Sequence, residues 1–365
     1  MNRTIRLAGT ALLAAVWAGL ALFAWFLPAK ETSDAERRPL AQMPELTAQS
    51  LINRKFMEGF EEYALDQFPM RDGFRRIKSL FHYYGLNQSD NNRIYIADGY
   101  AAEMEYPLDE ASVIHALSQF QKVYDRYLAE NDCRIYTAIV PDKGYYLAEK
   151  NGYLSMDYDR LFGLVHQYMP WSVQVDLTEK LRIGDYYFTD THWRQEKLFD
   201  VATTLSRAMG ITAPRMEDYT AVEVERPFYG VYYGQAALPM DPDTMYILQS
   251  DLLENCRVYN FVTDSYGDIY DMERLTGKDM YEVYLSGAQS LLRIENPNAL
   301  TDRELVVFRD SFGSSLVPLL VQDYASVTLV DIRYIQVGVL GRYVDFENAD
   351  VLFLYSTLVL NKKLI

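Results

Sequence analysis

The chain has 365 residues, 49% of them hydrophobic, which suits one large domain or two ordinary ones with a substantial core. Its formal net charge is −16, and the first thirty residues hold three basic and no acidic side chains, so the remainder is more acidic still. This balance excludes the basic surface on which nucleic-acid binding depends, and we expect no nucleic-acid partner. Two cysteines, Cys133 and Cys256, are too few for a disulfide scaffold or a zinc site, and they are either paired once or free.

The N-terminus predicts a membrane anchor. An uncharged run over residues 7–29 follows Arg3 and Arg6, and a membrane-spanning helix needs about 20 such residues. The run is longer than the apolar region of a cleaved signal peptide and reaches Pro28 without a convincing cleavage site, which favours an uncleaved signal anchor over residues 1–30. The two arginines place the N-terminus inside and the remaining chain outside the cell membrane, as a single-pass protein. Residues 31–50, with mixed charges and two prolines, predict a stalk.

Residues 51–365 predict one α/β domain. Apolar residues that recur every three or four positions indicate helices near residues 56–64, 74–84, 112–130, 194–209 and 316–323. Short apolar, β-branched runs indicate strands near residues 93–97, 133–140, 172–177, 304–308, 326–330 and 350–354. Their alternation predicts a parallel sheet. Between them, residues 213–302 are rich in turn residues and in alternating Tyr and Val, which predicts a β-rich insertion without a function of its own.

An acid and a histidine stand two positions apart in residues 186–193, Tyr-Tyr-Phe-Thr-Asp-Thr-His-Trp, and the chain has only four histidines. Residues at this spacing cannot face each other inside a regular helix, so we expect the pair in a loop at the entrance of the helix over 194–209. Asp190 would then orient His192, as the acid does in a nucleophile–His–acid triad. The alternative is that Asp190 only caps the helix.

Ser311 is the expected nucleophile. It lies in Arg-Asp-Ser-Phe-Gly-Ser-Ser, residues 309–315, between a predicted strand and a predicted helix. This context places its hydroxyl beside backbone amides that could stabilise an oxyanion. His192 would deprotonate Ser311, which would attack an acyl carbonyl, and the acyl group would pass to a hydroxyl or to water. The alternatives are a serine that only caps the helix, or Ser314 or Ser315 as nucleophile.

Four further residues are candidate substrate contacts. Lys143 follows the strand over 133–140, and ligands collect at the carboxyl ends of such strands; otherwise it is a solvated loop lysine. Arg333 and Tyr334 follow another strand, and otherwise form a surface ion pair and a packing contact. Trp193 is a sugar platform or a support for the histidine loop. No metal-ligand spacing and no glycine-rich phosphate loop occur, so we expect neither a metal nor a cofactor.

Asp190-Thr191-His192-Trp193, followed by Asp310-Ser311-Phe312-Gly313, resembles the bacterial DHHW-type proteins and the SGNH-hydrolase-like alginate O-acetyltransferases. In these families the Asp-x-His motif precedes the serine motif. The supporting segments are residues 68–72 (Phe-Pro-Met-Arg-Asp), 141–143 (Pro-Asp-Lys) and 331–334 (Asp-Ile-Arg-Tyr). Thr191 stands where the name-giving motif has a second His, and Arg309 stands where ordinary SGNH enzymes have Gly.

The resemblance implies a three-layer α/β/α SGNH-hydrolase-like fold, with Ser311 as nucleophile, His192 as base and Asp190 as its orienter. It implies an extracytoplasmic O-acetyltransferase that modifies a cell-surface polysaccharide through an acyl-serine. It also implies a membrane-bound O-acyltransferase as partner, which would deliver the acetyl group. Two alternatives share the same residues: a carbohydrate esterase that passes the acyl group to water, and a non-catalytic surface-assembly or glycan-binding protein.

Overall fold

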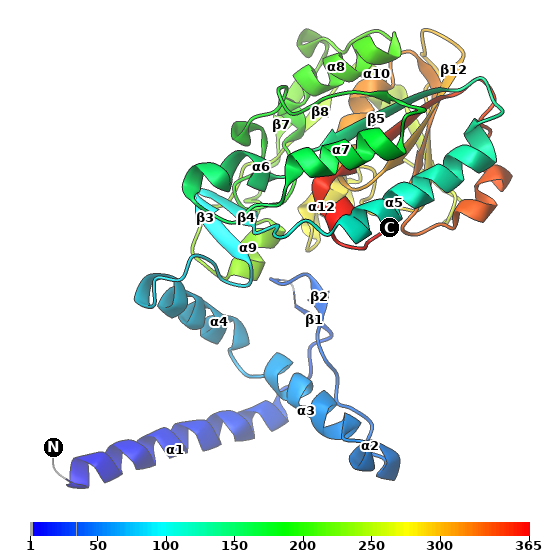
Figure 1. Cartoon of the computed structure of the whole chain (residues 1–365). Coiled ribbons are helices and arrows are strands. Elements are labelled where there is room, and N and C mark those ends of the chain that lie inside the picture. The colour runs from blue at the N-terminus through cyan, green and yellow to red at the C-terminus, as the bar shows by residue number, and fades with distance from the viewer. Residues whose placement is uncertain (1–2, 34) are drawn as a thin grey trace. The chain divides into compact units, whose positions relative to one another are not determined.

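The computed structural model describes residues 3–33 and 35–365, which form two compact units (Figure 1). The first unit comprises residues 1–92 and 233–239, and the second comprises residues 93–232 and 240–365. From the sequence we placed residues 51–92 in the catalytic domain, whereas in the structure they lie in the first unit.

The first unit is mainly helical. Within α1 (Arg3–Phe26), residues Ile5–Ala24 are long and apolar enough to cross a membrane, and none of that segment is buried. Residues 31–50, the predicted stalk, contain a small antiparallel pair, β1 (Thr32–Ser33) and β2 (Arg38–Pro39), and the start of α2. The helices that follow are α2 (Ala48–Ile52), α3 (Lys55–Asp66) and α4 (Arg71–Leu80), which continues as a π turn over Phe81–Gly85.

An eight-stranded sheet in the order β10-β9-β11-β13-β12-β14-β5-β6 is the centre of the second unit. Its strands are β5 (Arg134–Val140), β6 (Val173–Gln174), β9 (Arg257–Asn260), β10 (Ser265–Gly267), β11 (Leu291–Glu295), β12 (Arg303–Arg309), β13 (Tyr324–Val330) and β14 (Asp350–Ser356). The five strands from β13 to β6 are parallel to one another, while the pairs β13–β11, β11–β9 and β9–β10 are antiparallel. The predicted parallel α/β fold is therefore confirmed.

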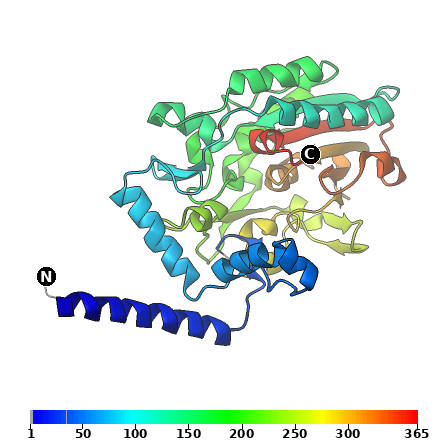
Figure 2. The same cartoon turned by 60° about the horizontal axis from the view of Figure 1, so that its bottom comes forward.

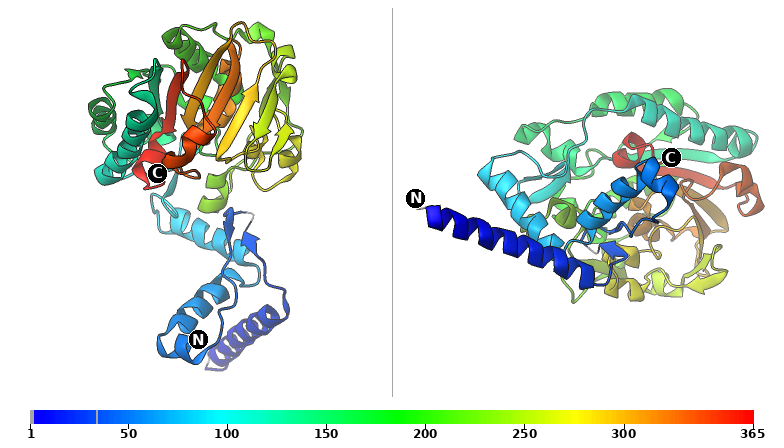
Figure 3. Two further views of the ribbon diagram at one scale, coloured as in Figure 1. Left: turned by 90° about the vertical axis from the view of Figure 1, so that its right-hand side faces the viewer. Right: turned by 90° about the horizontal axis from the view of Figure 1, so that it is seen from below.

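Helices cover both faces of this sheet (Figures 2 and 3). Side chains alternate along each strand, so Leu305 and Val307 of β12 pack toward one apolar layer, and Val306 and Phe308 pack toward the other. One layer includes α8 (Phe199–Met209) and α11 (Phe312–Leu316), and the other includes α5 (Glu110–Val123), α7 (Tyr158–Tyr168) and α12 (Thr357–Asn361). Burial on both faces explains the nearly continuous apolar sequence of the central strands.

The predicted insertion does not stand apart from the sheet. Its strands β9, β10 and β11 extend the sheet beyond β13, so these three strands belong to the central layer. Besides 3-10 and π turns, the smaller elements of the second unit include two antiparallel pairs and three short α-helices. They are β3 (Ile94–Ala97), β4 (Tyr100–Glu103), β7 (Thr220–Glu223), β8 (Tyr246–Gln249), α6 (Lys143–Leu147), α9 (Val231–Ala236, whose end lies in the first unit) and α10 (Asp251–Asn255).

Several element boundaries differ from the predictions. The helix expected from residue 194 begins at Phe199, because the Gln195 amide donates to the Ser315 carbonyl and accepts from the Leu248 N–H, which holds the segment before the helix in place. The strand expected over residues 172–177 is only two residues long, in β6. The helix expected over residues 316–323 starts earlier, at Phe312. Both cysteines are free.

Candidate active site

Ser311 lies in the turn between β12 and α11, at the carboxyl end of the sheet. Asp310, one residue earlier, fixes this turn through both of its carboxylate oxygens. Oδ1 accepts from the Phe312 N–H at 3.0 Å, and Oδ2 accepts from the Ser356 N–H at the end of β14 at 2.8 Å. The backbone of Ser311 is helical (φ −62°, ψ −24°), so its half-buried hydroxyl is presented without strain.

The Asp-x-His segment forms a closed loop beside that turn. Tyr186 and Trp193 pair as an antiparallel bridge at its base. Within it, Asp190 Oδ1 lies 2.6 Å from His192 Nδ1, and His192 Nε2 lies 2.8 Å from Ser311 Oγ. An ionised carboxylate only accepts hydrogen bonds, so Nδ1 carries the proton and Nε2 is free to accept from the serine hydroxyl. The structure thus joins Asp190, His192 and Ser311 in one hydrogen-bonded chain.

The second carboxylate oxygen of Asp190 is held by the insertion. Oδ2 accepts from the Val231 N–H at 2.9 Å, and the neighbouring Gly230 N–H donates to Thr189 Oγ1 at 2.8 Å. A Cβ atom at residue 230 would lie 2.3 Å from the Asp190 Cα, so only glycine fits there. The backbone of the insertion therefore passes directly against the triad acid.

Asp243, also from the insertion, secures the same loop at its beginning. Its carboxylate accepts from the N–H of Phe188 (2.7 Å), the N–H of Thr189 (2.8 Å) and the hydroxyl of Thr189 (2.6 Å). Burial raises the pKa of Asp243, while its hydrogen bonds with Thr189 oppose that shift. Three hydrogen bonds to one carboxylate compensate for its removal from water.

Lys143 approaches this loop as the first residue of α6. Its Nζ donates to the carbonyl oxygens of Tyr187 (3.0 Å) and Phe188 (3.3 Å), and it lies 5.0 Å from the centre of the Tyr232 ring. The side chain is buried, so Lys143 is neither a solvated loop lysine nor open to substrate. It supports the backbone just before Asp190.

Burial also controls the charge of Lys143. It lowers the pKa of this amine to about 7, although the carboxylates of Asp190, Asp243 and Asp142 act in the opposite direction. Burial likewise raises the pKa of the neighbouring Asp142 to about 6. The loop is thus supported by an amine that changes its charge near neutral pH.

Aromatic rings hold the imidazole in its plane. The Tyr281 ring stacks on His192 with centroids 3.8 Å apart and an interplanar angle of 8°. The Tyr281 hydroxyl lies 2.7 Å from Ser315 Oγ, which also accepts from Trp193 Nε1 at 2.9 Å. Phe312 packs against His192 at 4.9 Å. The base is therefore enclosed by rings that are themselves tied to α11.

The other serines of the motif are not available as nucleophiles. Ser315 is fully buried between Tyr281 and Trp193. Ser314 is also buried, and its hydroxyl accepts from Arg309 Nη1 at 3.0 Å. Ser311 is the serine that reaches the imidazole.

Of the other three expected substrate contacts, Trp193 and Arg333 are engaged within the protein and Tyr334 is exposed. Trp193 is fully buried, so it supports the histidine loop and offers no platform to a sugar. Arg333 is engaged by both oxygens of Asp331, at 2.8 and 2.6 Å. Tyr334, beside it, is 58% exposed. Of the three, Tyr334 presents a free surface.

Arg309 is fully buried behind the nucleophile turn. Its Nη1 donates to Ser314 and its Nη2 to the Gly287 carbonyl at 3.3 Å, while burial lowers the pKa of the guanidinium. A Cβ atom on Gly313 would lie 2.8 Å from the Arg309 Cβ. A side chain at residue 313 would therefore collide with Arg309, so the arginine requires the glycine of the motif.

The residues that sequence analysis missed all come from the insertion: Gly230, Val231, Asp243 and Tyr281. Gly230 carried a signal, since it stands among closely spaced turn residues. Val231 acts through its backbone, and neither Asp243 nor Tyr281 belongs to a motif. Val231, Asp243 and Tyr281 reach the site only because the fold brings the insertion against the Asp-x-His loop.

Comparisons with known proteins support the fold and the sequence resemblance. Residues 175–330 match the family model "DHHW protein", which confirms the resemblance predicted from the motifs. A DHHW family protein from Eubacterium siraeum DSM 15702 has a similar structure, with a TM-score of 0.60 and 20% identity over 74% of this chain and 93% of that one. Bacillus cereus PatB1 gives a TM-score of 0.61 and 19% identity over 74% and 98%. A second PatB1 structure, with a sulfonyl adduct, gives 0.60 and 19% over 74% and 97%. No curated protein matches the chain.

Gly230→Ala should disable the site. The added methyl group would meet the Asp190 backbone at 2.3 Å, so either the loop or the insertion must move. We expect a loss of about 1–3 kcal/mol of stability and loss of acyl-serine formation, measured by chemical unfolding and by mass spectrometry. Gly163→Ala in α7, where a Cβ meets nothing within 4 Å, is the matched control. If Gly230→Ala behaves like that control, the close approach is unimportant.

The stability of the protein should depend on pH through Lys143. The pKa of its amine is about 7 in the folded protein, against 10.5 for an ordinary lysine, so between these values the unfolded chain binds a proton that the folded chain does not. The free energy of unfolding of the wild type, relative to Lys143→Met, should therefore rise from pH 7 to pH 10, by at most about 1.4 kcal/mol per pH unit. Urea unfolding at several pH values measures this difference, with Lys150→Met at an exposed lysine as control. A pH-independent difference would contradict the assignment.

Proposed function

We propose that this chain is an O-acetyltransferase acting through an acyl-serine on Ser311, because residues 175–330 match the DHHW family model and the fold is similar to that of a DHHW family protein. One observation carries the proposal: His192 lies between Ser311 Oγ at 2.8 Å and Asp190 Oδ1 at 2.6 Å. The acceptor we propose is a hydroxyl group of a cell-surface polysaccharide, as the sequence resemblance implies.

The first half of the reaction loads the serine. His192 Nε2 takes the Ser311 proton as Oγ attacks the acyl carbonyl. The N–H groups of Phe312 and Gly313 already donate to Asp310, at 3.0 and 3.1 Å, which leaves the Ser311 N–H as the donor of this turn for the developing oxyanion. The carbonyl then re-forms, the leaving oxygen takes the proton from His192, and the acyl-serine remains.

The second half transfers the acyl group. A sugar hydroxyl gives its proton to His192 Nε2 and attacks the acyl-serine carbonyl. When the intermediate collapses, Ser311 Oγ leaves and recovers the proton. Throughout, Asp190 stabilises the imidazolium, and the stacked Tyr281 ring keeps the imidazole from rotating away from Ser311. With water in place of the sugar, the same steps describe an esterase.

We further propose that the protein is anchored in the cell membrane by α1, with its second unit outside the cytoplasm. The support is the apolar segment Ile5–Ala24 and the two arginines that precede it. A membrane-bound O-acyltransferase would then supply the acetyl group, since the proposed site lies outside the compartment in which activated acyl donors are made. Tyr334, exposed beside the Arg333–Asp331 pair, is the proposed contact for the polysaccharide.

Ser311→Ala should abolish covalent labelling by a sulfonyl fluoride and slow the hydrolysis of p-nitrophenyl acetate by about a thousandfold or more. A sulfonyl reagent is suitable because it reacts with an activated serine. Peptide mass spectrometry locates the adduct, which should fall on Ser311. Ser265→Ala, at an exposed serine of β10, is the control and should keep both activities. An unlabelled wild-type chain that is folded and inert toward the ester supports the non-catalytic alternative instead.

The acceptor decides between transferase and esterase. With p-nitrophenyl acetate as donor and acetyl-free oligosaccharides added, a transferase should acetylate the sugar in preference to water, measured as the ratio of acetylated sugar to free acetate. Acetate release that the sugar does not divert would favour the esterase.

A further inference from the structure

Helix α4 and its π turn expose a stripe of apolar side chains. Met70, Phe74, Ile77, Phe81 and Tyr84 follow one another at spacings of three and four residues, which places them on one face. All five are exposed, from 40% for Phe74 to 74% for Met70. In a soluble protein such a face is normally the one that is buried.

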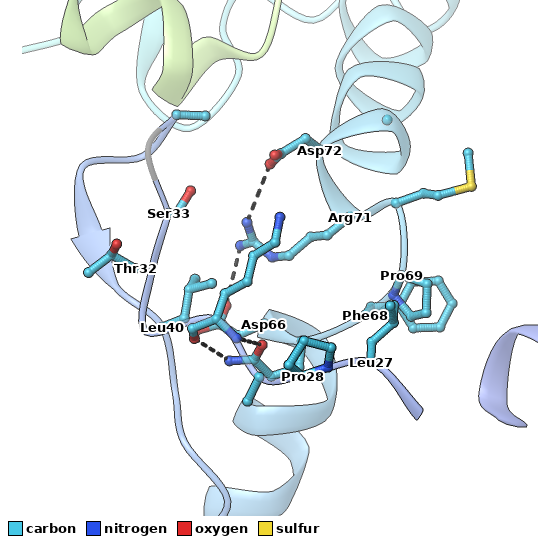
Figure 4. Close-up of a pocket in the computed structure, with 16 residues that line it drawn as sticks. Leu27, Pro28, Thr32, Ser33, Leu40, Asp66, Phe68, Pro69, Arg71 and Asp72 are labelled. Atoms are coloured by element: carbon cyan, nitrogen blue, oxygen red, sulfur yellow. Dashed lines mark hydrogen bonds and ion pairs between the residues drawn. The ribbon is translucent and has the colours of Figure 1, made fainter. Parts of the chain in front are cut away.

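The opposite face of α4 is polar and partly buried. Arg71 pairs with Glu36 and, at 3.3 Å, with Asp66, while Arg75 lies 3.5 Å from Glu36. Figure 4 shows Arg71 directed toward Asp66 and Asp72. One turn further along, Ser79 accepts a hydrogen bond from the Asn91 amide at 2.8 Å.

These contacts fix the orientation of the helix. Arg75 also donates to the Gly234 carbonyl at 2.9 Å, and burial lowers the pKa of its guanidinium. Rotating α4 to bury its apolar stripe would expose this network and break its ion pairs. The exposure of the stripe is therefore a stable feature of the fold.

Other helices of the first unit also expose large apolar side chains. Four large apolar side chains of α2 and α3 are at least half exposed: Leu51, Ile52, Met57 and Leu65. Soluble monomers rarely leave large apolar patches in water, and such patches mark surfaces for a membrane or a partner.

The stripe begins beside the point where the chain leaves α1. Lys30, four residues after α1 ends, exchanges two hydrogen bonds of 2.8 Å with the side chain of Gln67. A pocket of about 490 Å³ is lined both by Leu27 and Pro28 and by Met70, the first residue of the stripe (Figure 4). If α1 crosses the bilayer, α4 starts at its surface.

The cations around the stripe suit that position. Arg76 and Lys78 are exposed and flank Ile77 on either side along the sequence. They lie to the two sides of the stripe on the helix surface. The Arg76 guanidinium is engaged by the Tyr233 hydroxyl and ring, whereas Lys78 can reach lipid phosphates while the apolar face inserts. Apolar area with flanking cations is the pattern of a helix that lies in the membrane interface.

We propose that Met70, Phe74, Ile77, Phe81 and Tyr84 insert into the interface of the bilayer that holds α1, so that α4 lies along the membrane surface. The inference rests on the membrane anchoring proposed above and is independent of the catalytic assignment. It gives the first unit a role, which is to bind the lipid surface through a second element besides α1.

The test uses the full chain reconstituted in lipid nanodiscs. A polarity-sensitive fluorophore is attached to a single added cysteine, in Ile77→Cys or Phe81→Cys, and nitroxide-labelled lipid is the quencher. Asp72→Cys, exposed on α4 but outside the stripe, is the matched control. Val16→Cys in α1 reports the bilayer itself, and the chain without an added cysteine corrects for labelling of Cys133 and Cys256.

We expect a blue-shifted emission and loss of fluorescence with nitroxide lipid at residues 77 and 81, as at residue 16, and neither effect at residue 72. Quenching at residue 16 without quenching at 77 and 81 would overturn the inference while the anchor stands. A blue shift without quenching, together with cross-linking between two copies or to an added membrane protein, would show that a protein covers the stripe. That result would overturn the inference that lipid does. Absence of quenching at residue 16 would remove the anchor and the inference together, and would leave the ester hydrolysis test of Ser311 unaffected.

Discussion

The organisation of the site depends on one buried carboxylate. Asp190 is fully buried, and a buried charge is tolerated only when it is hydrogen-bonded. Its two oxygens are occupied by different parts of the chain: Oδ1 by His192 and Oδ2 by the Val231 N–H. The bond to His192 fixes the imidazole tautomer, and the bond to Val231 fixes the carboxylate itself. Both are needed for Nε2 to face Ser311 as an acceptor.

The insertion is therefore part of the candidate site. It supplies the glycine whose backbone passes directly against that of Asp190, the carboxylate of Asp243 that holds the loop, and the Tyr281 ring stacked on the imidazole. Lys143 supports the same loop from α6. A loop fixed by several elements can hold catalytic groups to within the small tolerance that acyl transfer demands.

The sequence predicted the central strands well, because strands that are buried on both faces have nearly continuous apolar sequences, such as residues 304–308. It also predicted Asp190, His192 and Ser311 as one site, since the two motifs supply complementary chemistry. It missed Asp243 and Tyr281, whose roles arise from folding across distant segments. Periodicity found α4 but not which side of it is buried, because three- and four-residue spacing defines a face without saying what covers it. Arg71 and Arg75 form the ion pairs on the other face of α4, and nothing in the sequence distinguishes them from ordinary surface arginines.

The proposed mechanism requires that Asp190 hold His192 as the Nδ1–H tautomer, with Nε2 directed at Ser311. Nitrogen-15 NMR of the histidine-labelled protein tests it most directly, with the His192→Gln variant identifying the signal among four histidines. The account predicts a protonated Nδ1, with its proton shifted strongly downfield by the short bond to Asp190, and an unprotonated Nε2 in the neutral ring. A neutral His192 that carries its proton on Nε2 would contradict the account, since that nitrogen could not accept the proton of Ser311.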